Sequence, residues 1–105
     1  MDSIQAASRS MAIRSAYHGL ERKHHGSEWS IEEDALAFLT DAALIGRLAM
    51  AQQERWPTGS DPNPELFHKI GESMWWLTVL AERMGLDSSQ ALEQFLQNKE
   101  QQFKE

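Results

Sequence analysis

Residues 63–85 read NPELFHKIGESMWWLTVLAERMG, and this stretch sets the fold. Asn63 followed by Pro64 is a typical helix start, and Gly85 is a typical left-handed cap at a helix end. Between them, apolar residues recur at the three- and four-residue spacing of one helix face. They are Phe67, Ile70, Met74, Leu77 and Ala81, with Leu80 widening the stripe. The pattern predicts a helix over residues 64–84 that buries this face.

Three further helices are predicted around this segment. Ser30 with Glu33 forms a capping-box pattern, Asp87 opens a similar start, and Gly26 follows a basic last turn. The helices are expected over residues 4–25, 31–55 and 88–103. No strand pattern competes with them. The sequence therefore predicts an all-α, four-helix bundle that forms one domain.

The helix predicted over residues 31–55 is apolar nearly all round, and within residues 35–51 only Asp41 and Arg47 carry a charge. Such a helix should be central, and in so short a chain a central helix indicates an interface. We therefore expect a homodimer or a pair of dimers. Asp41 must face a groove or be paired, and Arg47 of a partner helix is one possible mate.

Composition limits the classes of partner. The chain has 10 Lys and Arg residues against 16 Asp and Glu residues, which gives a net charge of −6 and argues against binding of DNA or RNA. Cysteine is absent, which suits a reducing cytoplasm. No apolar run approaches the roughly 20 residues that span a bilayer. These features predict a soluble cytoplasmic protein without a membrane partner.

A shorter segment, residues 69–77 with the sequence KIGESMWWL, suggests a family. Together with the turn at Gly85 and the helix that carries Ala91 and Lys99, it resembles the third and fourth helices of MazG-like proteins. The close match covers about a third of the chain. In that family the third helix carries an E-x-x-D motif before an aromatic-rich half. The second helix carries E-E-x-x-E, to which residues 38–45 correspond.

The resemblance implies an all-α nucleoside triphosphate pyrophosphohydrolase. In such an enzyme, four acids from two helices hold Mg²⁺, which binds the phosphates and activates the water that splits off pyrophosphate. Acids at positions i and i+3 or i+4 lie on one helix face, and two such faces across a groove make the oxygen cage that Mg²⁺ prefers.

This sequence departs from the family pattern at most of the acid positions. Lys69 stands where the first acid of E-x-x-D belongs, and Glu72 replaces its Asp. Asp41 can stand for one Glu of the second helix, but Leu44 and Ile45 supply no carboxylate one turn later. Asp41 and Glu72 are thus the remaining candidate metal ligands. We hypothesise that the Lys69 ammonium pairs with Glu72, and with Asp41, in place of the metal.

Other residues near this motif are candidates for substrate contacts. Lys69 and His68 are candidate phosphate contacts, and Trp76 is a candidate wall for a base, whereas Trp75 suits core packing better. Alternatively, Glu72 is an ordinary exposed helical residue that pairs with Lys69. The remaining histidines lack the spacing of a helical metal site. They are His18, His24 and His25.

Two functions from different classes remain open. The first is an enzyme that uses Mg²⁺ to remove pyrophosphate from a nucleotide, with Asp41 and Glu72 as reduced metal ligands. The second is a non-catalytic relative, whose groove binds a nucleotide without metal or whose helices serve as an assembly module. The missing acids favour loss of the usual mechanism, because electrostatic stabilisation is usually the largest catalytic contribution.

Overall fold

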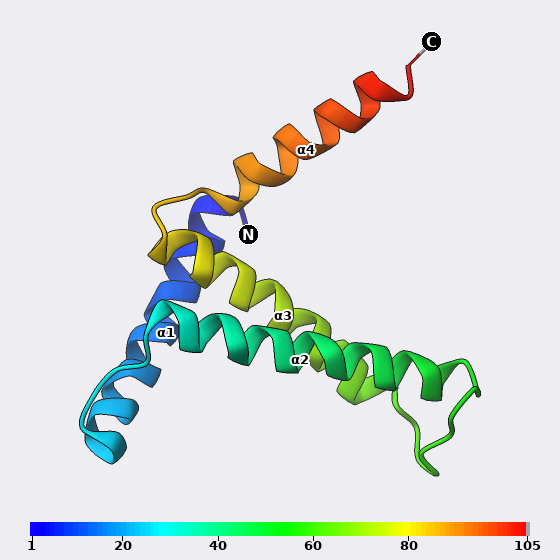
Figure 1. Ribbon diagram of the computed structural model, residues 1–105, viewed down its shortest axis with the longest axis horizontal. Helices are drawn as coiled ribbons and strands as arrows, with labels where there is room; N and C mark the ends of the chain where they lie inside the picture. The colour runs from blue at the N-terminus through cyan, green and yellow to red at the C-terminus, as the bar shows by residue number, and fades with distance from the viewer. Residues whose placement is uncertain (105) are drawn as a thin grey trace.

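The computed structural model describes residues 1–104, which form four helices joined by loops, without a strand (Figure 1). Its helices are α1 (Ser3–His25), α2 (Ile31–Gln52), α3 (Asn63–Arg83) and α4 (Ser88–Gln102). The predicted all-α class is confirmed, and most of the predicted boundaries agree to within one or two residues.

Side chains cap the N-terminal ends of α1, α2 and α4. The predicted capping box of α2 is present, because Glu33 N–H donates to Ser30 Oγ at 3.1 Å and Ser30 N–H donates to Glu33 Oε1 at 2.9 Å. Asp2 and Gln5 form a second such box at the start of α1, which the sequence analysis missed. Asp87 accepts from two backbone N–H groups at the start of α4. Each box satisfies donors that a helix start leaves unpaired.

The end of α2 differs from the prediction. The helix stops at Gln52 and not near residue 55. Glu54 adopts a left-handed conformation with φ of 61°, and the Arg55 N–H returns to the Met50 carbonyl at 2.9 Å. This local turn closes the helix end and begins the loop to α3.

The predicted cap of α3 is also wrong. Asn63 is the first helical residue, while Pro62 takes the cap position without a side-chain hydrogen bond. The Asn63 side chain is engaged elsewhere, since its Oδ1 accepts from Gln52 Nε2 at 2.8 Å. Its backbone N–H donates to Asp61 Oδ1 at 3.0 Å. Asn63 therefore links the start of α3 to the end of α2.

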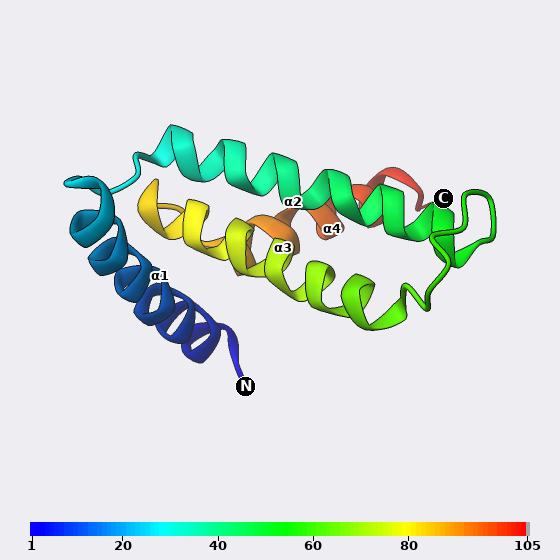
Figure 2. The same cartoon turned by 90° about the horizontal axis from the view of Figure 1, so that it is seen from below.

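The helices α2 and α3 run antiparallel and side by side, and α1 packs against the C-terminal half of α3 (Figures 1 and 2). The buried apolar residues come from α2 and α3 only. They are Leu48 and Ala51 from α2, and Trp76, Val79 and Leu80 from α3. This core is small for a chain of 105 residues. Much of the interior is polar instead, because Arg14, Asp34 and Ser73 are also buried.

The face of α3 that the sequence analysis assigned to the core is mostly exposed. Phe67 is 84% exposed, and Ile70, Met74 and Leu77 are exposed as well. The buried face carries Trp76 and Leu80. The periodicity favoured the more apolar face of α3, whereas the face that α2 covers also carries the polar residues Lys69 and Ser73. Contacts with polar residues of α1 and α2 made that choice.

The last helix leaves the other three. Figure 1 shows α4 extending away from α1, α2 and α3, and none of its residues is buried. Its predicted apolar face, which includes Leu92, Phe95 and Leu96, is exposed. Within residues 1–104, three helices pack together and the fourth projects from them. A closed four-helix bundle does not form within one chain.

The open arrangement leaves a large surface. The radius of gyration is 16.7 Å, whereas a compact chain of this length has about 13 Å. The accessible surface is 8061 Å², whereas a compact monomer of this mass has about 6,000 Å². None of the helices described is long and apolar enough to cross a membrane.

Candidate functional site

The candidate motif residues Asp41, Lys69 and Glu72 meet between α2 and α3. Lys69 Nζ donates to Asp41 Oδ1 at 3.1 Å and to Glu72 Oε1 at 2.9 Å. Trp76 Nε1 donates to the other oxygen, Asp41 Oδ2, at 2.9 Å. All four side chains are mostly shielded from solvent. The hypothesised pairing of Lys69 with both carboxylates is therefore present, and we call these four residues the lysine cluster.

Helix geometry explains why these residues converge. Lys69 and Glu72 lie three residues apart, and Trp76 lies seven residues after Lys69, so all three share one side of α3. Asp41 lies seven residues after Asp34 and seven before Leu48, on the face of α2 that turns toward α3. The antiparallel pairing of α2 and α3 then places Asp41 opposite Lys69.

The electrostatics of the cluster favour a charged lysine. Hydrogen bonds to Glu72 and then Asp41 raise the pKa of Lys69 above its ordinary value of 10.5, against the smaller opposing effect of burial. An ammonium has three N–H donors, and two of them are used here. One cation between two carboxylates leaves the cluster with one net negative charge. Lys69 is thus committed to holding carboxylates and is poorly placed to bind phosphate.

The cluster does not fit Mg²⁺, which prefers six oxygen ligands in octahedral geometry. Asp41 and Glu72 are the only carboxylates in it, and an ammonium already lies between them. Among the residues that the structure describes, no group of at least three Asp, Glu, His or Cys side chains is arranged to hold a metal ion. The donor set therefore gives no basis for a metal-dependent step.

Trp76 is the more buried of the two tryptophans, although Trp75 was expected to pack in the core. Trp76 is buried and bonded to Asp41, so its ring is not a free wall for a base. Trp75 is only partly buried. Its Nε1 donates to the Ser10 carbonyl at 3.1 Å, and its ring centroid lies 6.0 Å from that of Tyr17. The helix turns Trp76 toward α2 and Trp75 toward α1, because adjacent residues point about 100° apart.

His68 does not join the lysine cluster. It is exposed and lines a cavity of about 460 Å³ between α1 and α3, whose wall also includes Ile13, Tyr17 and Glu72. Arg47, the proposed mate of Asp41, lies over the Trp56 ring with its Cζ 4.7 Å from the centroid. Among the described residues, neither His68 nor Arg47 forms a hydrogen bond or an ion pair with Asp41.

A second polar cluster, which the sequence analysis missed, lies at the junction of α1, α2 and α3. The Arg14 guanidinium is 1% exposed and Asp34 is fully buried at 0%. Arg14 donates to Asp34 through Nε at 3.0 Å and through Nη2 at 2.7 Å. It also donates to Glu21 at 2.7 and 3.2 Å. Arg14 thus makes a bidentate ion pair with each carboxylate, and we call this group the arginine cluster.

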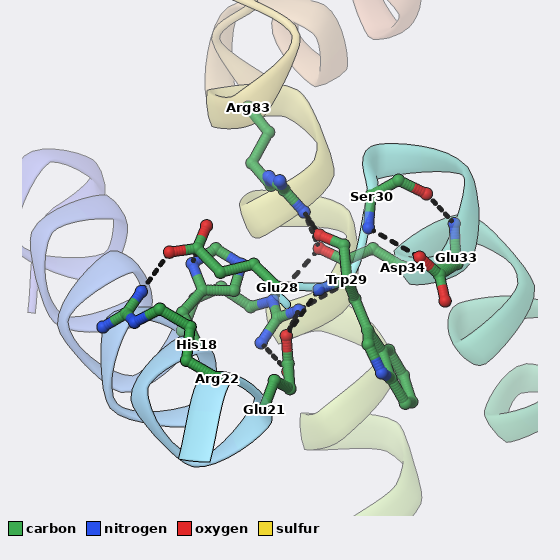
Figure 3. Close-up of polar contacts among 10 residues, drawn as sticks. His18, Glu21, Arg22, Glu28, Trp29, Ser30, Glu33, Asp34 and Arg83 are labelled. Carbon is green, nitrogen blue, oxygen red and sulfur yellow. Dashed lines mark hydrogen bonds and ion pairs between the residues drawn. The ribbon is translucent and has the colours of Figure 1, made fainter. Parts of the chain in front are cut away.

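Figure 3 shows how other residues complete the arginine cluster. Arg83 Nη1 donates to Asp34 Oδ2 at 2.7 Å and to the Trp29 carbonyl at 3.1 Å. The Trp29 N–H donates to Glu21 Oε1 at 2.8 Å. These bonds attach the loop between α1 and α2 to the end of α3. The buried charges are therefore balanced and hydrogen-bonded, as burial of ions requires.

The charge states follow from these contacts. Burial opposes ionisation of Glu21, but hydrogen bonds from Arg14 and from the Trp29 backbone outweigh it and lower the pKa of Glu21 below its ordinary value of 4.5. Burial likewise opposes the charge on Arg14, but hydrogen bonds to Asp34 and Glu21 raise its pKa. Arg14 and Glu21 are consequently both ionised near neutral pH.

A signal for the arginine cluster exists in the sequence. Arg14 and Glu21 lie seven residues apart on α1, and Asp34 lies seven residues before Asp41 on α2. Seven-residue spacing of charges on a helix that should pack against neighbours indicates an inward-facing polar row.

Trp76, a member of the lysine cluster, also lies next to the arginine cluster. Its ring centroid is 5.7 Å from Arg14 Cζ, while its Nε1 is bonded to Asp41. A cavity of about 290 Å³ opens beside it, with Glu21, Glu72 and Trp75 among its lining residues. No family model, curated protein or solved structure matches the chain.

Proposed function

We propose that this chain is a non-catalytic helical module of MazG type that serves in protein assembly. In it, the Lys69 ammonium takes the place that a metal ion holds in the active members of that family. The reaction that the resemblance implies, release of pyrophosphate from a nucleoside triphosphate, is absent from the proposed function.

One observation carries the proposal. Lys69 Nζ lies 3.1 Å from Asp41 Oδ1 and 2.9 Å from Glu72 Oε1. These are the two acids that the resemblance leaves as metal ligands, so a divalent cation would have to displace an ammonium that is already paired. Electrostatic repulsion between Lys69 and the cation would oppose its entry. Phosphate cleavage without metal would lack its main source of charge neutralisation.

The open architecture supports the assembly role. The chain exposes about 2,000 Å² more surface than a compact monomer of its mass. Large apolar side chains are exposed on all four helices, and those of α4 have no buried neighbour on their own helix. A single chain that buries so few apolar residues gains its stability partly from a partner.

Two substitutions at Lys69 test the loss of metal chemistry. Lys69→Glu replaces the ammonium with a third carboxylate, and Lys69→Met removes the ammonium without adding a ligand. By titration calorimetry with Mn²⁺ and Mg²⁺, we expect binding only in the Lys69→Glu variant, because it alone has three acids. None of the three proteins should release pyrophosphate from nucleoside triphosphates.

Other outcomes of these experiments would contradict the proposal or change its explanation. Micromolar binding of Mg²⁺ or Mn²⁺ by the native chain would overturn the proposal, since Lys69 would then not replace the metal. Release of pyrophosphate by the native chain would support the enzymatic alternative. Metal binding by Lys69→Met to the same extent as by Lys69→Glu would show that the ammonium, and not the missing acid, had been the obstacle.

A further inference from the structure

A continuous groove runs along the seam between α1 and α3. Three cavities of about 440, 460 and 290 Å³ follow one another along α1, and Trp75 lines all three. Ile13 is shared by the first two cavities and Tyr17 by the last two. Their shared walls make them one feature, which we call the Trp75 groove.

The walls of the Trp75 groove are mainly apolar. Exposed side chains on it include Ile13, Tyr17 and Phe67, which are all large and lack an apolar neighbour on their outer side. Glu72 lies on the wall and carries part of the net negative charge of the lysine cluster. The groove is also lined by Arg9, His24, His25 and His68, so Glu72 marks one local position for a basic group on an otherwise apolar occupant.

The α4 helix has the complementary pattern. Leu92, Phe95, Leu96 and Phe103 follow the spacing of one helix face and are all exposed. Lys99 lies within that stripe, with its Nζ 5.8 Å from the centroid of the Phe95 ring, and it is the only basic residue of α4. Helices with such anchors bind apolar grooves in other proteins.

The dimensions also agree. The 15 residues of α4 span about 22 Å at 1.5 Å per residue. The groove follows α1 from Ala6 to His25, a stretch of about 29 Å, so α4 can lie within its length. An isolated helix of this length is marginal in water, so α4 needs a surface on which to pack.

We propose that the occupant of the Trp75 groove is α4 from a second copy of this chain, with the exchange made reciprocally about a two-fold axis. In this arrangement the apolar stripe of α4 covers Ile13, Tyr17 and Phe67, and Lys99 approaches Glu72. This inference rests on the proposed assembly function. It specifies the partner, which is a second copy of the chain, and the surface, which is the Trp75 groove.

The available area suits this pairing. An excess of about 2,000 Å² on each chain, if covered in the pair, exceeds the 1,200–2,000 Å² that stable interfaces typically bury in total. The pair then falls in the class of obligate dimers. The direction of α4 favours a second copy over its own chain, because the helix points away from the α1 and α3 pair (Figure 1).

Two leucines of nearly equal exposure give a matched test by sedimentation velocity on the full chain. Leu92 on α4 is 59% exposed, and Leu39 on the outer face of α2 is 63% exposed. We expect the native chain to be a dimer, and Leu92→Glu to raise the dimer dissociation constant more than about 100-fold. Leu39→Glu should remain dimeric. Lys99→Met should weaken the dimer up to about fivefold, as expected for one rim ion pair.

Cross-linking identifies the surface that α4 contacts. The chain has no cysteine, so a Gln97→Cys variant carries one benzophenone label on α4. Mixed with an isotopically heavy native copy, it should cross-link to the groove residues of that copy, on residues 6–20 or 67–75.

Three results would overturn the exchange. They are a monomeric native chain, cross-links confined to the labelled copy, and a dimer lost through Leu39→Glu but kept in Leu92→Glu. If Leu39→Glu abolished the dimer and Leu92→Glu did not, the assembly function would remain, but the interface would not be the Trp75 groove. Metal binding or pyrophosphate release would overturn the proposed function without affecting the cross-links, so the two failures are distinguishable.

Discussion

Trp76 on α3 donates its indole Nε1 hydrogen to Asp41 Oδ2 on α2 at 2.9 Å. The other oxygen of Asp41 accepts from Lys69, so both are occupied by donors from the neighbouring helix. A carboxylate inside an apolar helix is costly unless it is paired in this way. Asp41 therefore fixes the register between α2 and α3.

Replacing Asp41 should destabilise the fold. Asp41→Leu leaves the Trp76 N–H without an acceptor in a buried position and Lys69 with one partner. We expect the free energy of unfolding to fall by about 1–3 kcal/mol, the cost of an unsatisfied buried group. Urea denaturation followed by tryptophan fluorescence measures it. The exposed neighbour Thr40→Leu should stay within about 0.5 kcal/mol, and an equal loss in both variants would contradict the role of Asp41.

The arginine cluster should contribute more to stability than any surface ion pair. Arg14→Met leaves Glu21 and the fully buried Asp34 with fewer donors, and breaking such a buried network costs about 3–5 kcal/mol. Arg22→Met removes an exposed pair with Glu28 and should cost less than about 1 kcal/mol. Thermal or urea unfolding compares the two. Similar losses would show that the buried cluster is not a major stabilising element.

Acid should weaken the protein through Glu21. Its pKa is lowered in the fold, so its ionised form contributes stability above its ordinary pKa of 4.5. That contribution disappears as the pH falls through the lower pKa of the folded state. Between about pH 6 and about pH 3, the free energy of unfolding should therefore fall more steeply in the native chain than in Glu21→Gln. Parallel pH profiles of the two proteins would refute this prediction.

Two glycines should respond in opposite directions to alanine. Gly85 has φ of 75° in the turn after α3, a conformation that strains any side chain. Gly85→Ala should therefore lower the unfolding free energy by about 1 kcal/mol or more. Gly46 lies inside α2, where an added Cβ meets nothing within 4 Å. Gly46→Ala should raise stability by about 0.5–1 kcal/mol in the same urea assay, because alanine favours the helix. Changes of the same sign would contradict the assigned conformations.

The sequence by itself determined the helices and much of their capping. Ser30 with Glu33 starts α2, and Gly26 and Gly85 end α1 and α3 in left-handed conformations. Such signals act over three or four residues and depend little on the rest of the fold. The spacing of Lys69 and Glu72 also predicted their ion pair, because residues three apart meet on any helix.

Only the tertiary structure decided which faces are buried and which charges meet. Phe67 and Met74 lie on the more apolar face of α3, which periodicity favours, whereas the buried face also carries Lys69 and Ser73. The contacts of Asp41 with Lys69 and Trp76, and of Arg14 with Asp34, join residues 20 to 35 positions apart. Their formation depends on how helices cross, and local spacing carries no information about that. The long-range pairing of charges, with the small apolar core, selected the face of α3 that is buried.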